Sequence, residues 1–350
     1  MVLSNSHRKG IYIYFKVVYS CPTVLEFEFL KRWKMGFKEI GVLGFSSLAI
    51  KNVLEVCRKF DLDPCNVSRW VESFRGLGFS DDTVCKVLEV NPMVIMASEE
   101  VILDKVRFLE KIGLERRGID WVFGEFPAVL SYGMENRLIP LMSEFQDLGI
   151  SRGEVKKEIV RDPRVLGLEV GELSQCLRML RSLKCRFSVK EEIFKDGILR
   201  AGYKVKLRVD CLCKYGLIRR EAFGIIWREP RVILYDMKDI ERKIDFLIKE
   251  MKFDVQWLLE VPEYLGISFE KQIVPRYNVI EYLRSKEQVN LKIQHPVGMW
   301  KLFKPQKYAQ SKEDAKNIRS FMEPLGQAVS SKSKPTSMEQ MQHGSFSSTF

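Results

Sequence analysis

The sequence predicts an all-α protein, a curved superhelical solenoid of tandem helix-pair repeats of about 34 residues. Three observations lead to this fold class. A proline followed by branched apolar residues recurs along the chain, a glycine stands fourteen residues before four of these prolines, and an apolar residue stands fourteen residues after four of them. Three markers that share one period indicate repeated units, each too small to bury its apolar stripe alone.

The proline marker sets the period. It occurs at Pro92, Pro127, Pro163, Pro230 and Pro262. The gap between the third and fourth prolines is about double the others, and its midpoint holds Asp196-Gly197-Ile198-Leu199, which has the same cadence without a proline. The intervals are then 35, 36, 33, 34 and 32 residues. Because proline removes a backbone donor and disfavours helical geometry in the residue before it, each marker predicts the end of a helix.

The other two markers place a second helix in each repeat. The glycines are Gly78, Gly113, Gly149 and Gly216, and the apolar residues are Val106, Leu141, Leu177 and Ile244. Glycine commonly closes a helix in the left-handed conformation, so an amphipathic helix over about residues 99–111 should end at Gly113. The last repeat has four residues fewer between Lys252 and Pro262 than between Gly78 and Pro92, which predicts a lost helical turn.

Capping residues predict where the first helices begin. Ser80 suits an N-cap, and Asp63 suits one with Pro64 at the first helical position. The segments 151–154 and 188–191 both have the Ser-x-x-Glu spacing of a capping box.

Positive charge is concentrated in the central repeats. The chain has 57 Lys plus Arg against 46 Asp plus Glu, a net charge of +11, and residues 178–228 hold 14 of the basic residues against 5 acidic ones. Such a segment is either the solvated faces of amphipathic helices or a surface that follows phosphates. The candidate nucleic-acid-binding residues are Arg178, Arg181, Lys184, Arg186, Arg200, Lys204, Lys206, Arg208, Lys214, Arg219, Arg220 and Arg228.

Three aromatic residues are interleaved with these cations. Tyr203, Tyr215 and Phe223 could stack on an exposed base, although aromatic residues on helices are more often part of the core. Lys204, Lys206 and Arg208 cannot all share one helical face.

The composition excludes several other classes. No uncharged apolar run approaches the length of a membrane span, so we expect no membrane partner. The eight cysteines are scattered, which favours reduced thiols. Cys211 and Cys213 are two residues apart, so on a helix their sulfurs point to different sides and are poorly placed to bind one metal ion. The chain lacks the common phosphate-loop, zinc-protease and nucleophile-elbow motifs and has three histidines. We therefore expect no catalysis, no cofactor and no metal.

The ordered set of motifs resembles the mitochondrial transcription termination factor (mTERF) family. The resemblance rests on the openings at residues 77–80 and 148–151, the Pro-x-Val-[Leu/Ile] elements at 127, 163 and 230 with their ordered repetition, and the helix start at 241–244. Residues 269–277 are similar to the closing segment of a plant member. The resemblance covers about residues 41–303, and the repeat at 196–199 departs from it by lacking its proline.

Membership would imply a solenoid, often with a short 3₁₀ turn after the proline, whose basic concave face holds duplex DNA or structured RNA in mitochondria or chloroplasts. It would imply non-catalytic binding that regulates transcription termination, organellar gene expression or group II intron splicing. Other organellar expression factors are further partners to consider, and we expect a monomer. The resemblance favours the mitochondrion, with the chloroplast as the alternative.

The two ends differ from the repeats. Residues 1–40 are expected to be a divergent extension or targeting segment, because Ser and Arg near the start fit a transit peptide while Glu26 and Glu28 do not. Residues 304–350 are rich in Ser and Lys and should be mostly disordered, with at most a helical turn or two at 314–321.

Two other repeat classes share the period. Tetratricopeptide arrays would make the chain an α-helical scaffold for protein partners, but their Trp, Tyr, Ala and Phe positions are not found in register. Pentatricopeptide arrays read RNA one base per repeat and lack the interval of fourteen residues from glycine to proline.

Overall fold

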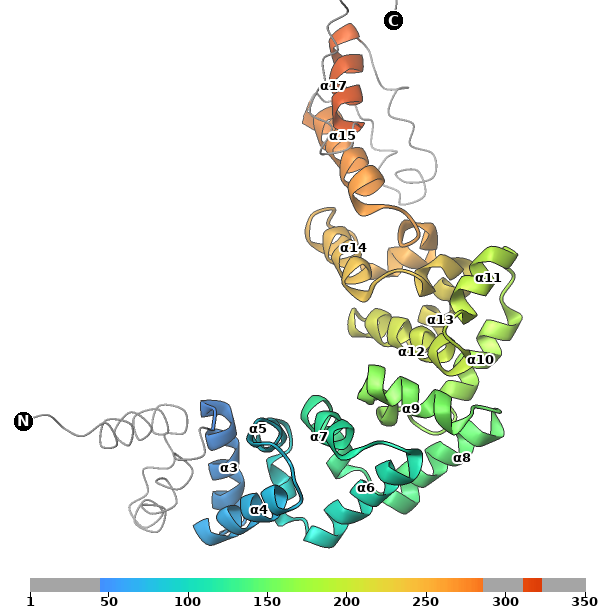
Figure 1. Cartoon of the computed structure of the whole chain (residues 1–350). Helices are drawn as coiled ribbons and strands as arrows, with labels where there is room; N and C mark the ends of the chain where they lie inside the picture. The colour runs from blue at the N-terminus through green and yellow to red at the C-terminus, as the bar shows by residue number, and fades with distance from the viewer. Residues whose placement is uncertain (1–44, 286–310, 323–350) are drawn as a thin grey trace, which may run out of the picture. The chain divides into compact units, whose positions relative to one another are not determined.

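All regular structure in the described part of the chain is helical (Figure 1). This computed structural model describes residues 45–285 and 311–322. The chain divides into two compact parts, residues 1–234 and 235–350, which are considered separately below. The predicted fold class is confirmed: the chain is an all-α solenoid of helical repeats. The segment 1–40 and most of the tail 304–350 lie outside the described residues.

The first part consists of helix pairs joined by short turns. Its elements are α3 (Ser47–Lys59), α4 (Pro64–Gly76), α5 (Asp81–Val90), η2 (Pro92–Met96), α6 (Glu99–Ile112), α7 (Arg116–Glu125), η3 (Pro127–Ser131), η4 (Met134–Leu138), α8 (Ile139–Asp147), α9 (Arg152–Arg161), η5 (Pro163–Gly167), α10 (Glu172–Ser182), α11 (Phe187–Phe194), α12 (Ile198–Lys214), α13 (Arg219–Arg228) and η6 (Pro230–Ile233).

The second part continues the same alternation. Its elements are α14 (Met237–Lys249), η7 (Val255–Leu259), η8 (Pro262–Tyr264), η9 (Phe269–Ile273), α15 (Val274–Ser285) and α17 (Lys312–Met322). The last of these is a correction, because the sequence predicted at most two turns at 314–321 and the helix has eleven residues. Ile318 is buried and the Asn317 amide donates to the Tyr282 hydroxyl of α15 (3.1 Å), which supplies the tertiary contact that composition could not reveal.

The periodic prolines each begin a 3₁₀ turn, namely η2, η3, η5, η6 and η8. A proline at the first position loses nothing there, since its missing donor would have no partner, and its fixed φ suits the turn. The four periodic glycines have φ of 83°, 100°, 77° and 106°, which is the left-handed geometry that lets the preceding helix end. The apolar residues fourteen positions after the prolines are all buried.

The N-caps follow the sequence with one exception. Ser80 caps α5, and Asp63 caps α4 with Pro64 at the first helical position. Ser151 and Glu154 form a complete capping box on α9. The box predicted at 188–191 is wrong. Helix α11 begins at Phe187, two residues before the start that Ser188 would cap, and no side chain caps it.

Two repeats depart from the pattern in the way their sequences indicate. In the repeat that lacks a proline, no 3₁₀ turn forms, and Gly197 (φ 101°) leads directly into the seventeen-residue α12. In the last repeat the first helix shrinks to the 3₁₀ helix η7, as the shorter spacing predicts. There Lys252 takes the left-handed conformation (φ 59°) in place of the usual glycine.

Single turns of π-helix precede two other prolines. η4 runs into α8 before Pro140, and η9 runs into α15 before Pro275. A proline inside a helix removes one backbone bond, and a π turn shifts the pattern so that Leu138 N donates to Gly133 O (3.2 Å).

Packing within the first part differs along its length. Helices α3, α5 and α7 pack in a row, α10 packs along α12, and α12 packs along α13. Helices α4, α6 and α8 pack less extensively against one another. Between α8 and α10, the buried Glu144 carboxylate accepts from Gly171 N (2.7 Å) and from the Ser174 hydroxyl (2.6 Å), which caps α10 from the preceding repeat.

Candidate nucleic-acid interface

Two equivalent turns hold an arginine in the same fixed way. At η5, Arg164 donates Nε to Asp162 Oδ1 (2.8 Å) and Nη2 to Asp162 Oδ2 (3.0 Å) across Pro163. At η6, two repeats later, Arg231 donates Nε to Glu229 Oε1 (2.7 Å) and Nη2 to Oε2 (3.0 Å). We call these two arrangements the acid-proline-arginine clamps.

The clamps expose their cations and bury their acids. The side chains of Arg164 and Arg231 are 65% and 51% exposed, whereas those of Asp162 and Glu229 are 10% and 7% exposed. The hydrogen bonds that Arg164 donates to Asp162 raise the pKa of Arg164 above its ordinary value. Each fork-to-fork pair uses Nε and Nη2 of the guanidinium, so the cation is held rigidly at the surface.

Both clamps lie on 3₁₀ turns of the first part. η3 contacts η5, and η6 contacts α11 and α12. Arg161 and Arg228 occupy the matching position two residues before each proline, and both are exposed. We call Arg161, Arg164, Arg228 and Arg231 the turn-edge cations.

Several predicted cations of α12 and α13 instead join neighbouring repeats. Arg200 donates to Glu158 of α9 (2.7 Å), and Arg219 donates to Glu172 of α10 (2.8 Å). Lys204 pairs with Asp196 (3.4 Å). Lys206 pairs with Asp210 one turn along the same helix.

Arg208 is a correction to the predicted set. It is 6% exposed, its Nε donates to Val232 O (3.4 Å) and its Nη1 to Lys204 O (3.2 Å). A buried guanidinium that ties α12 to η6 has no route to a phosphate in this conformation. The sequence indicated that Lys204, Lys206 and Arg208 cannot all share one helical face, but it did not indicate which of them is buried.

The remaining predicted cations are at the surface. Arg178 and Arg181 lie on α10, Lys184 and Arg186 follow it, and Arg220 lies on α13; all five are exposed and form no ion pair within residues 45–285 and 311–322. Lys214 at the end of α12 is exposed as well.

The predicted aromatic residues divide between core and surface. Tyr203 is 1% exposed and its hydroxyl donates to Asp162 Oδ2 (3.2 Å), so it cannot stack on a base. Burial raises the pKa of Tyr203. Tyr215 and Phe223 are half-buried, and Trp227, one turn after Phe223 on α13, is 45% exposed.

Arg161, Arg164 and Arg231 are not among the binding residues predicted from the sequence. The signal was present, because Asp162-Pro163-Arg164 and Glu229-Pro230-Arg231 repeat an acid-proline-arginine triplet at the same place in two repeats. The high density of basic residues indicated residues 178–228, whereas the clamps are indicated by one triplet that recurs at equivalent positions of two repeats.

The thiols and acids offer no metal set in the part of the chain that the structure describes. Seven cysteines there form no disulfide, and burial raises the pKa of the Cys57 and Cys176 thiols to about 12, which keeps them protonated. Within the same residues, no helix combines the length and apolar character needed to cross a bilayer.

The mTERF family model matches residues 14–186 and 199–294. The chain belongs to the mTERF family. The break in the match coincides with α11 and the repeat that lacks its proline. This mTERF protein is similar to the transcription termination factor MTERF15, mitochondrial, of Arabidopsis thaliana, at 44% identity over 349 residues, covering 88% of this chain and 78% of the relative. It is also similar to the chloroplastic transcription termination factor MTERF8 of the same plant, at 29% identity over 230 residues, covering 65% of this chain and 45% of the relative.

Proposed function

We propose that this protein is an organellar nucleic-acid-binding factor that acts by occupying its target without catalysis. The observation that carries the proposal is the pair of clamps, which hold Arg164 and Arg231 rigidly at the same position of two repeats. Phosphates recur regularly along a nucleic acid, so cations fixed at a regular interval suit a backbone better than freely moving side chains do.

The proposed contact surface combines two sets of residues. The turn-edge cations supply ordered contacts, and the exposed Arg178, Arg181, Lys184, Arg186 and Arg220 supply further positive charge in the same part of the chain. Lys214 is an additional candidate, whereas Arg208 and Tyr203 are excluded by burial. Tyr215 and Phe223 stay candidates for stacking on an unpaired base.

The similarity to two organellar termination factors supports a role in transcription termination or in the wider control of organellar gene expression, with group II intron splicing as a further form of the same binding. We propose the mitochondrion as the compartment, because the longer and more similar alignment is with a mitochondrial protein. The chloroplast is the alternative, supported by the second relative. Duplex DNA and structured RNA are both candidate targets.

The test is the salt dependence of binding. Fluorescence anisotropy of the full chain with a labelled duplex DNA and a labelled RNA hairpin should give a logarithmic salt slope of roughly −0.9 per phosphate contact on DNA, and the steeper, tighter ligand identifies the target class. The double variant Arg164→Glu and Arg231→Glu should lower the slope by about two contacts.

A matched control keeps that result specific. Arg75 is an exposed cation at the end of α4 and pairs with Asp81 (2.6 Å), so Arg75→Glu changes the net charge without touching the turn edge. Equal slopes in the clamp variant and in Arg75→Glu would reject the proposed surface. Absence of binding to both nucleic acids would favour the protein scaffold instead.

A further inference from the structure

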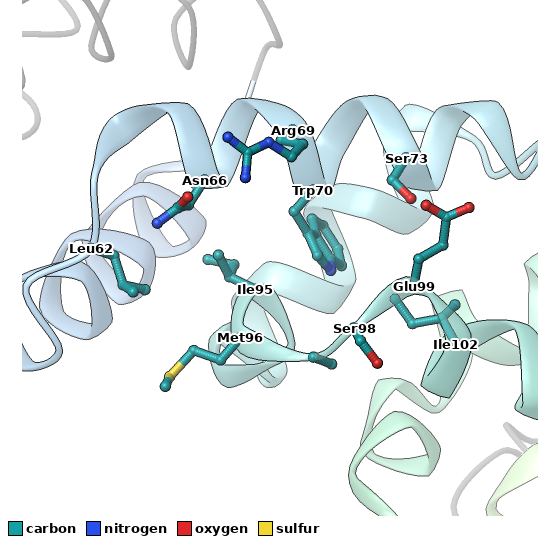
Figure 2. A pocket seen from close by; sticks show the side chains of 11 residues that line it. Leu62, Asn66, Arg69, Trp70, Ser73, Ile95, Met96, Ser98, Glu99 and Ile102 are labelled. Atoms are coloured by element: carbon teal, nitrogen blue, oxygen red, sulfur yellow. The ribbon is translucent and has the colours of Figure 1, made fainter.

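A cavity in the early repeats contains buried polar groups that have no hydrogen-bond partner within the described residues. It lies between α4, η2 and the start of α6, measures about 410 Å³, and is lined by apolar side chains that include Ile95, Met96 and Ile102 (Figure 2). Its volume is within the range of sites that hold small ligands or single side chains.

Two donors in this cavity are unsatisfied. Trp70 is 6% exposed, and Figure 2 shows its indole hanging from α4 with the nitrogen directed toward the turn that holds Ser98. Neither Trp70 Nε1 nor the Ser73 hydroxyl has a hydrogen-bond partner in the described part of the chain. Leaving a buried donor unpaired is unfavourable, so the cavity calls for a ligand that offers an acceptor such as a carbonyl oxygen.

The cavity has counterparts in the next repeats. A cavity of about 530 Å³ lies beyond the first turn of α6, and one of about 450 Å³ adjoins it through the shared residues 131–133 and Asn136. The second of these holds Arg137, whose Nη2 donates to Gly167 O (2.9 Å) while its Nε has no partner in the described residues. An unpaired donor therefore recurs along this face.

Each cavity also carries one exposed carboxylate outside the ion pairs of the described residues, and the second cavity holds in addition Asp104, which pairs with Arg107 (3.1 Å). Glu99, Glu135 and Glu169 line the three cavities in turn, lie near the start of successive second helices, and form no ion pair within the described residues. Of the cations in these cavities, Arg69 is exposed, Lys105 is 3% exposed and Arg137 stacks on the Tyr132 ring (3.8 Å), so exposed carboxylates outnumber exposed cations. The exposed carboxylates disfavour a phosphate backbone here.

We propose that this face of the first part docks an extended, basic and apolar segment of a protein partner. An apolar side chain of the segment enters the cavity beside Trp70, and its backbone carbonyls accept from Trp70 Nε1 and Arg137 Nε. Lysines or arginines of the segment meet Glu99, Glu135 and Glu169. The inference is independent of the proposed nucleic-acid surface, which uses other residues.

The probe follows from the lining of the cavities. Its lysines are distributed along the peptide because the carboxylates lie in three separate cavities, and its leucines match the apolar lining. A labelled twelve-residue peptide of four Lys-Leu-Ser triplets is compared with a peptide of the same composition in which the lysines form one block. Because the chain has a net charge of +11, general electrostatics repel both peptides, and binding reports a local surface.

We expect the triplet peptide to bind the full chain more tightly than the block peptide. Trp70→Phe, which removes only the indole donor and some volume, should weaken that binding about tenfold. Glu99→Lys should weaken it by a similar factor, while Glu110→Lys, the same charge change at the far end of α6, should not. Should Trp70→Phe fail to fold, Met96→Gln at a 48% exposed position of the same cavity removes apolar lining without a change of charge and should also weaken binding.

Three results would overturn the proposal. These are equal binding of the two peptides, unaltered binding in Trp70→Phe and Glu99→Lys, and displacement of the peptide by duplex DNA or an RNA hairpin. The last result would assign the face to nucleic acid. Failure of the nucleic-acid proposal is a separate outcome, because it is measured with Arg164 and Arg231 variants that leave these cavities intact.

Discussion

The hydroxyl of Tyr203 donates a hydrogen bond to Asp162 Oδ2 (3.2 Å), the same carboxylate that holds Arg164. Tyr203 belongs to α12 and Asp162 follows α9, so a residue from the next repeat fixes the acid of the clamp. Asp162 is 8% exposed, and a buried carboxylate with two donors has little freedom to rotate. The position of the exposed arginine thus depends on the interior of the solenoid.

Tyr203→Phe should weaken both folding and binding. Loss of the hydroxyl should lower the free energy of unfolding by about 1 kcal/mol, because Asp162 loses a buried donor. Nucleic-acid affinity should fall by a few-fold with the salt slope unchanged, since no cation is removed. Urea denaturation and anisotropy titrations measure the two effects. A lower slope would show that Tyr203 itself controls the number of phosphate contacts.

The clamps need the shape of arginine as well as its charge. The double variant Arg164→Lys and Arg231→Lys retains both charges but cannot form the paired bonds to Asp162 and Glu229. We expect lower affinity for the nucleic acid at every salt concentration and an almost unaltered salt slope. Affinity equal to that of the natural chain would mean that free cations serve as well as clamped ones.

Replacing Lys252 by glycine should stabilise the folded chain. Its φ of 59° is unfavourable for a residue with a side chain, and the other repeats have glycine at the matching helix end. Lys252→Gly should raise the free energy of unfolding by about 0.5 kcal/mol, because the relief of backbone strain exceeds the added entropy of the unfolded chain. Gly149→Lys, at φ 77° with open space around it, should lower it by about 1 kcal/mol. Thermal melts that move in the opposite directions would contradict this interpretation.

Glu158 should make stability depend on pH. Burial raises its pKa above the ordinary value of 4.5, and the Arg200 guanidinium opposes this without reversing it. The folded chain therefore binds this proton more tightly than the unfolded chain, so the stabilisation is complete below pH 4.5 and is lost as the pH rises through the raised pKa. The melting temperature of the natural chain relative to Glu158→Gln should fall from pH 4 to pH 7. A relative increase over that range would show that the pair with Arg200 dominates.

Local signals predicted most of the fold. Proline and glycine act on their own backbone and on adjacent residues, so Pro92 and Gly113 could be interpreted without tertiary information. The fates of Tyr203 and Arg208 could not, because their partners, Asp162 and Val232, lie in other repeats. Ser188 has the right spacing for a capping box, but α11 starts two residues before the position that Ser188 would cap, so this local signal does not set the helix boundary.

The sequence predicted the basic region of the candidate site but not the individual contacts of its residues. Charge counting found the central repeats, yet half-buried ion pairs such as Arg200 with Glu158 use part of that charge to join helices. The clamps are periodic, and only a comparison of equivalent positions between repeats distinguishes Arg164 and Arg231 from other arginines.

Hydrogen–deuterium exchange with and without the bound nucleic acid tests most directly whether the turn edge is the contact surface. The account predicts slower amide exchange in residues 161–168 and 228–234 on binding, with no change in residues 95–102 of the α4–α6 cavity. Protection confined to residues 95–102, or spread over the second helices with the two turns unaffected, would contradict it.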